Sequence, residues 1–232
     1  MKQSLSTEKL VHYVDQQLQH FFPDGNHHSD EIKSLLANTL ERLNYCFSHI
    51  NRKYYQQEIN GQMYTQFNHL NSDHYASFLY LLSNEAWRDD AIILAEKLFY
   101  LNKALNGLDC FYSIKLPEIF MFVHPVGTVL GNAEYQNYFV VYQGVTVGST
   151  LNGKYPVFNE GCVLYEKSSV IGCCRLGKNI TIAAGALVIN QQIDENITVF
   201  EQSPRLQMRA TNIDVIVDVF GIETNNKKAL DK

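Results

Sequence analysis

Residues 158–188 read FNEGCVLYEKSSVIGCCRLGKNITIAAGALV and repeat with a period of six. A row of aliphatic or aromatic residues recurs at every sixth position, and a second, mostly small row follows it four positions later. The first row is Phe158, Leu164, Val170, Leu176, Ile182 and Val188, and the second is Cys162, Ser168, Cys174, Ile180 and Ala186. An α-helix repeats every ~3.6 residues and an exposed strand every two, so neither explains the spacing. The period predicts a hexapeptide β-helix, in which each hexad is one short strand and a corner turned by the small residue.

The strand-like pattern extends on both sides of this stretch, over residues 109–204. Val141 and Val147 keep the spacing of six, whereas residues 134–138 are one residue short of it. Residues 149–156 (STLNGKYP) interrupt the rhythm with polar residues. We expect them to form a loop that leaves one corner of the β-helix, where repeat proteins often place function.

Residues 1–108 are predicted to form an α-helical domain. Apolar residues between positions 32 and 50 recur three and four positions apart, which gives a helix one apolar face. The pair Asn106-Gly107 is typical of a helix C-terminus. The predicted fold class is therefore an N-terminal α-helical domain, a parallel β-helix over 109–204 and a C-terminal tail over 205–232.

The composition excludes several classes of protein. The chain has 232 residues and a formal net charge of -5, which argues against a nucleic-acid-binding protein because such proteins need a basic face. The N-terminus lacks the apolar run of a secretory signal, and no stretch is long and apolar enough to span a membrane. The five cysteines are an odd number, with Cys173 and Cys174 adjacent, so they make a poor disulfide framework. We expect a cytoplasmic protein with reduced thiols.

No metal site is expected. His27 and His28 are adjacent, but no Cys, Asp or Glu accompanies them at the spacing of metal ligands, and a solvated turn between helices explains them better. The sequence also lacks the glycine-rich phosphate-binding motifs and the nucleophile motif of hydrolases.

Two motifs in the β-helix resemble those of the serine acetyltransferase family. Residues 123–131 read VHPVGTVLG, similar to the family's His-x-x-Gly-x-x-x-Gly stretch, and residues 142–148 read YQGVTVG, similar to its Gln-x-Val-Thr-Leu-Gly strand. The family also has a helical N-terminal domain, an extruded loop and regular hexads. The resemblance implies a left-handed parallel β-helix, assembled as a homotrimer or a dimer of trimers. It also implies acetyl-CoA as co-substrate in the groove between neighbouring β-helices, with no bound cofactor.

The resemblance places His124 at the position of the family's catalytic histidine. Acyl transfer to a hydroxyl needs a general base, and histidine titrates near neutrality. Asp109 lies fifteen residues earlier, where the family has the aspartate that orients this histidine. Gly148 and Ser149 stand where the family has a Gly-Gly pair that binds the oxyanion and CoA. The alternatives are a structural role for His124 and a capping role for Asp109 at the junction of the two domains.

Departures from the family pattern concern the acceptor. The acid directly before the family's histidine is Val123 here, and the basic residue and histidine of its loop are Lys154 and Tyr155. These three acceptor-binding candidates clamp a zwitterion less well and suit a sugar ring better. We therefore expect an acetyl-CoA-dependent O-acetyltransferase that acts on a sugar or nucleotide sugar in polysaccharide biosynthesis. The alternatives are serine O-acetylation, N-acetylation of an amino sugar and a non-catalytic trimeric scaffold, which Ser149, Glu166 and Gln202 leave open.

Overall fold

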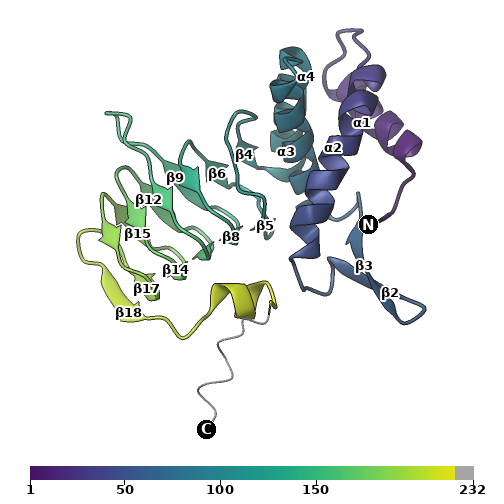
Figure 1. Cartoon of the computed structure of the whole chain (residues 1–232). Coiled ribbons are helices and arrows are strands. Elements are labelled where there is room, and N and C mark those ends of the chain that lie inside the picture. The colour runs from purple at the N-terminus through teal and green to yellow at the C-terminus, as the bar shows by residue number, and fades with distance from the viewer. Residues whose placement is uncertain (223–232) are drawn as a thin grey trace.

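A helical part lies beside a parallel β-helix in the computed structural model, which describes residues 1–222 (Figure 1). The tail predicted for 205–232 is therefore described only as far as residue 222, and its last ten residues lie outside the described range. None of the helices in this range combines the length and the apolar content needed to cross a membrane.

Four helices form most of the N-terminal part. They are α1 (Thr7–Phe21), α2 (Ser29–Ser48), α3 (Ser72–Arg88) and α4 (Ile92–Asn106). Helix α3 packs against both α2 and α4, and its residues 74–86 are buried throughout. Helix α4 ends at Gly107, whose left-handed backbone provides the predicted C-terminal cap. Because α3 is enclosed on all sides, its first turn is a rigid platform next to the β-helix.

A three-stranded sheet interrupts the helices, and the prediction of an α-helical domain over 1–108 did not include it. Strands β2 (Gln56–Ile59) and β3 (Gln62–Phe67) form an antiparallel hairpin, and β1 (Lys2–Gln3) pairs in parallel with β3. Asn60 and Gly61 at the hairpin turn both have positive φ, as a two-residue turn of this kind requires.

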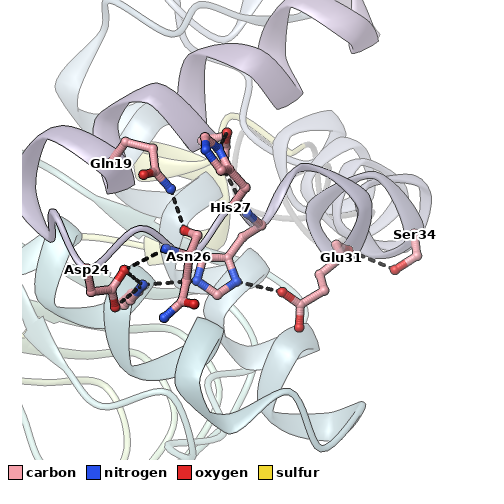
Figure 2. A network of polar contacts seen from close by, with 9 residues as sticks. Gln19, Asp24, Asn26, His27, Glu31 and Ser34 are labelled. Carbon is pink, nitrogen blue, oxygen red and sulfur yellow. Dashed lines mark hydrogen bonds and ion pairs between the residues drawn. The ribbon is translucent and has the colours of Figure 1, made fainter.

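The turn between α1 and α2 was predicted to be solvated, but polar contacts hold it and bury His28; Figure 2 shows several of these contacts. His28 is buried, and its Nδ1 lies 2.5 Å from Glu31 Oε2. Its Nε2 lies 3.1 Å from Lys97 Nζ, and Lys97 also pairs with Asp24 at 2.7 Å. Because an ammonium only donates, His28 Nε2 accepts from Lys97 and Nδ1–H donates to Glu31. His28 therefore joins α2 to α4, whereas His27 is exposed at the surface.

The chain winds from residue 109 into about five coils, whose strands stack in three sheets. We call them the covered sheet, the open sheet and the third sheet. The covered sheet contains β5 (Phe120–Phe122), β8 (Phe139–Val141), β11 (Cys162–Leu164), β14 (Ile180–Ile182) and β17 (Ile197–Phe200), with β18 (Gln207–Ala210) added antiparallel. The open sheet contains β4 (Asp109–Cys110), β6 (Val129–Leu130), β9 (Thr146–Gly148), β12 (Ser169–Ile171) and β15 (Leu187–Ile189). The third sheet contains β7 (Glu134–Tyr135), β10 (Val157–Phe158), β13 (Arg175–Leu176) and β16 (Gln192–Ile193).

The strand register confirms the period of six. In a regular coil Cys162 pairs with Ile180, eighteen residues later, which is three hexads. Phe139 pairs with Cys162, twenty-three residues later, because the predicted loop is inserted in that coil. Val129 pairs with Thr146, only seventeen residues later, which is the predicted shortening by one residue. All six members of the first hexad row are fully buried inside the coils.

The corner between the covered and open sheets is turned by residues with positive φ. Gly127, Gly144, Lys167 and Gly185 occupy the equivalent position in four successive coils, and His124 is a further residue with positive φ at this corner. Each precedes a buried residue, such as Ser168 or Ala186, so the small second-row residue fills the inside of the corner instead of turning it. Lys167 is the only one of the four with a side chain, and it carries the steric cost of a left-handed backbone.

The C-terminal segment 211–222 closes the fold, and we call it the strap. In Figure 1 the yellow chain returns from β18 toward the end of α2. The Val215 N–H donates to Asn179 Oδ1 at 3.0 Å, and the Asn51 N–H donates to the Phe220 carbonyl at 2.7 Å. The strap contains the short π-helix η1 (Val215–Val219). It ties the last coils of the β-helix to the helical part.

Candidate active site

His124 lies at the corner between β5 and β6. Its backbone has a φ of +48°, and its side chain is 76% exposed. The half-buried Val123 before it donates its N–H to the Val141 carbonyl at 2.9 Å, and the Val126 N–H donates to the His124 carbonyl at 2.7 Å. The backbone around His124 is therefore fixed by the coil, while the imidazole projects into solvent where an acceptor can reach it.

The carboxylate in contact with His124 belongs to Asp73, in the first turn of α3. Its Oδ1 accepts the His124 backbone N–H at 3.0 Å and lies 3.9 Å from His124 Nδ1. The Asp73 side chain is only 17% exposed. Burial raises the pKa of the Asp73 carboxyl, and the N–H and imidazole of His124 oppose that rise. Asp73 is absent from the predicted site residues because in the sequence it reads as an ordinary acid in the first turn of a helix.

Asp109 begins the open sheet in β4, beside Val129 of β6. Its backbone N–H donates to the Thr128 carbonyl at 2.9 Å. Its Oδ2 lies 2.6 Å from Lys103 Nζ in the last turn of α4. Within residues 1–222 no hydrogen bond or ion pair joins Asp109 to His124. The role of Asp109 as the orienting aspartate stays a prediction.

The oxyanion candidates and the predicted loop lie at a different corner. Gly148 ends β9, Ser149 is exposed directly after it, and the chain then enters the loop toward β10. The loop is closed by a hydrogen bond from the Thr150 N–H to the Lys154 carbonyl at 3.1 Å. Lys154 and Tyr155 are both exposed. Their side chains are therefore free to contact a ligand or another chain.

The two groups of candidate residues occupy opposite edges of the open sheet. His124 comes before β6, on the edge shared with the covered sheet, and the loop follows β9, on the edge shared with the third sheet. No contact found in the described part of the chain joins His124 or Val123 to Lys154 or Tyr155. The contacts within one chain therefore do not join these four residues into one site.

The described residues contain neither a cluster of metal ligands nor an activated buried thiol. They contain no group of three or more His, Cys, Asp or Glu side chains placed to hold a metal ion. All five cysteines are free, and four of them are buried. Burial raises the pKa of Cys46 and Cys162 to about 12, which keeps these thiols protonated and unreactive.

Comparison with known proteins identifies similar sequences. No protein-family model matches the chain. A serine acetyltransferase of Synechococcus elongatus is 30% identical over 101 residues, which cover 42% of this chain and 41% of that protein. Serine acetyltransferase 2 of Arabidopsis thaliana is 25% identical over 144 residues, which cover 56% and 45%. The chain thus spans about half the length of the curated relatives it matches.

Solved structures resemble a larger share of the chain. Serine acetyltransferase of Neisseria gonorrhoeae gives a TM-score of 0.69 at 17% identity and covers 94% of this chain and 84% of that one. Serine acetyltransferase of Brucella abortus in complex with coenzyme A gives 0.67 at 16% identity, with coverage of 90% and 83%. At this identity the likeness shows the fold alone. It confirms the predicted helical domain followed by a left-handed parallel β-helix.

Proposed function

Because the chain is serine acetyltransferase-like in sequence and in fold, we propose that it is an acetyl-CoA-dependent O-acetyltransferase. The observation that carries this proposal is the exposed His124 imidazole, held on a fixed backbone next to the Asp73 carboxylate. His124 would take the proton of the acceptor hydroxyl as its oxygen attacks the thioester carbonyl. The CoA thiolate would then leave and receive that proton from the imidazolium. Backbone N–H groups near Gly148 and Ser149 would stabilise the oxyanion.

We propose serine as the acceptor, ahead of the sugar expected from the sequence. The relatives named above are serine acetyltransferases, and none of their names mentions a sugar. The argument for a sugar rested in part on the loss of an acid at Val123, beside the changes at Lys154 and Tyr155. Asp73 supplies a negative charge beside His124 from another part of the chain, which weakens that argument.

We further propose that the active enzyme is a homotrimer with its open sheets facing the threefold axis. The outward side chains of Val129, Ile171, Leu187 and Ile189 give this sheet's outer face an apolar part, beside the polar Asp109, Thr146 and Ser169, and they are partly or well exposed. Association would remove them from water. It would also place the loop of one protomer beside His124 of the next, with acetyl-CoA in the groove between them. The two corners of the open sheet would then form one site.

The test is acetyl-CoA consumption by purified protein with serine, homoserine, simple sugars and nucleotide sugars. We expect turnover with serine that is lost in His124→Ala and kept in His12→Ala, a matched change of an exposed histidine on α1. Turnover only with a sugar would restore the sugar assignment. No turnover with any acceptor, together with no heat of CoA binding in calorimetry, would refute the proposal and favour a scaffold.

A further inference from the structure

We propose that a second site, a cleft between α2, α3 and the segment 113–118 that connects β4 to β5, binds a small aromatic carboxylate. The cleft has a volume of about 920 Å³, which is within the range of small-molecule sites in proteins. Its α3 wall is formed by the second half of that helix, whereas Asp73 is in the first turn. Asn84 follows Asp73 by eleven positions, which is roughly 17 Å along a helix. A ligand in this cleft therefore leaves the space beside His124 free.

A buried carboxylate holds two arginines at the cleft. The Glu85 side chain is 9% exposed, and its Oε1 accepts hydrogen bonds from Arg42 Nη1 and, at 3.0 Å, from Arg88 Nη1. Arg42 Nη1 also donates to Asn84 Oδ1 at 3.0 Å. Within residues 1–222, no hydrogen bond uses Nε or Nη2 of either arginine. One carboxylate thus fixes two guanidiniums, and their remaining donors can bind a second carboxylate.

The cleft also offers an aromatic surface, at Trp87 in the last turn of α3. The indole is 39% exposed, and among the described residues no ring or cation stacks on it and no hydrogen bond uses its Nε1–H. Across the cleft on α2, Tyr45 is 46% exposed and contacts the His49 ring, with centroids 4.7 Å apart. Exposed tryptophan and tyrosine rings are typical of recognition sites. Because Trp87 and Arg88 both line the cleft, one ligand can contact a ring and a guanidinium.

The remaining charges of the cleft favour a ligand with one negative charge. Lys115 adds a cation that has no ion pair in the described part of the chain, and Glu41 and Glu118 add two carboxylates. A phosphate monoester would bring close to two negative charges near these acids. A carboxylate brings one, and its two oxygens match the fork of a guanidinium. The cleft is therefore suited to a carboxylate joined to a flat ring.

The fluorescence of Trp87 reports on this cleft directly, because it is the only tryptophan in the chain. We expect 3-phenylpropionate to change the emission of the wild-type protein saturably. 3-Phenylpropanol, which lacks the charge, and propionate, which lacks the ring, should bind about tenfold more weakly or worse. L-Phenylalanine separates two sources of the carboxylate. Tighter binding than that of 3-phenylpropionate would identify an aromatic amino acid, and weaker binding an aromatic acid without an amino group.

The variant that tests the carboxylate contact is Arg88→Gln. It should raise the Kd of 3-phenylpropionate about tenfold, and it should fold because Glu85 keeps its contact with Arg42. Lys33→Gln is the matched control, since Lys33 is an exposed cation of α2 outside the cleft, and it should leave the Kd unchanged. His124→Ala should also bind the probe as the wild type does.

Three results would overturn the inference. They are the absence of a saturable change in emission, equal affinity for 3-phenylpropionate and 3-phenylpropanol, and an unchanged Kd in Arg88→Gln. A loss of binding in His124→Ala would place the probe in the proposed active site and would overturn the inference as well. The titration needs no catalysis, so a protein that acetylates nothing would contradict the proposed function and leave this test intact.

Discussion

His74, the residue after Asp73, is a histidine that is buried in the core, unlike the exposed His124. Its Nδ1 accepts the Asn68 N–H at 3.2 Å, so Nε2 carries the proton of the neutral ring. The ring packs against Phe47 and Tyr55, with centroids 4.9 and 4.5 Å away, and Nε2 has no hydrogen-bond partner among the described residues. Burial lowers the pKa of His74 to about 4. Adjacent positions on one helix thus hold an anion at the site and a neutral histidine in the core.

This burial makes folding stability depend on pH. The unfolded chain binds a proton at His74 near pH 6.5, whereas the folded chain keeps the ring neutral down to about pH 4. The contribution of His74 is therefore complete above pH 6.5 and is lost as the pH falls toward 4, by a total on the order of 3 kcal/mol. Urea unfolding at pH 7 and pH 5 should show the loss. His74→Asn, which cannot titrate, should flatten the dependence, and an equally steep dependence in that variant would contradict this assignment.

At the scale of elements, the hexad corners explain why the β-helix forms. Each inward residue packs mainly on the residues one coil above and below it, so a short repeat in the sequence specifies the whole stack. The corner beside His124 is turned by three glycines and by Lys167, which has a φ of +58°. A lysine in this conformation is strained, whereas glycine adopts it freely.

Replacing Lys167 with glycine should therefore stabilise the protein. We expect the free energy of unfolding to rise by up to about 1 kcal/mol, because relief of the left-handed backbone exceeds the extra entropy of glycine in the unfolded chain. Lys178→Gly is the matched control, since Lys178 is absent from the positive-φ positions and pairs with Glu160 at 3.6 Å. Urea unfolding of the control should show a loss. A loss of similar size in both variants would show that strain at this corner is negligible.

The sequence predicted the elements that repeat locally and missed those that depend on distant partners. The hexad row, the one-residue shortening and the inserted loop all depend on residues in adjacent coils. By contrast, β1 pairs with β3 across more than sixty residues, and nothing in its two residues indicates a strand. The contact between Asp73 and His124 spans 51 positions. No period or spacing in a single sequence encodes it. Asp109 was predicted from the interval of fifteen residues that precedes His124, and its role stays a prediction.

At the scale of the whole molecule, the two corners of the open sheet predict how the active site is shared. If the loop of one protomer completes the site of the next, two inactive variants should rescue each other. We expect a mixture of His124→Ala chains and chains with Lys154→Ala and Tyr155→Ala, unfolded and refolded together, to recover about a quarter of the wild-type sites. Mixing without refolding is the control. No recovery after refolding would mean that each chain builds its site alone.

The same model of assembly predicts the effect of charge on the open sheet. Leu187→Glu should separate the protomers in sedimentation equilibrium, from about three times 26.6 kDa to the mass of one chain, because a carboxylate resists burial in an apolar interface. Arg175→Glu, on the third sheet, is the control and should leave the mass unchanged. A wild-type protein that sediments as a single chain would refute the trimer directly.

The strap has a consequence for how this protein is made. Arg52 donates from Nε to the Val219 carbonyl at 2.5 Å, and Asn51 reaches the Gly221 carbonyl across 170 positions of sequence. Ribosomes release these partners in a fixed order, with residues 51 and 52 first, every coil next and the strap last. Helices and coils can assemble one after another during translation. The contacts of Asn51 and Arg52 with the strap can form only after residue 221 has been synthesised. A prematurely terminated chain therefore leaves this docking site empty and accessible to proteases.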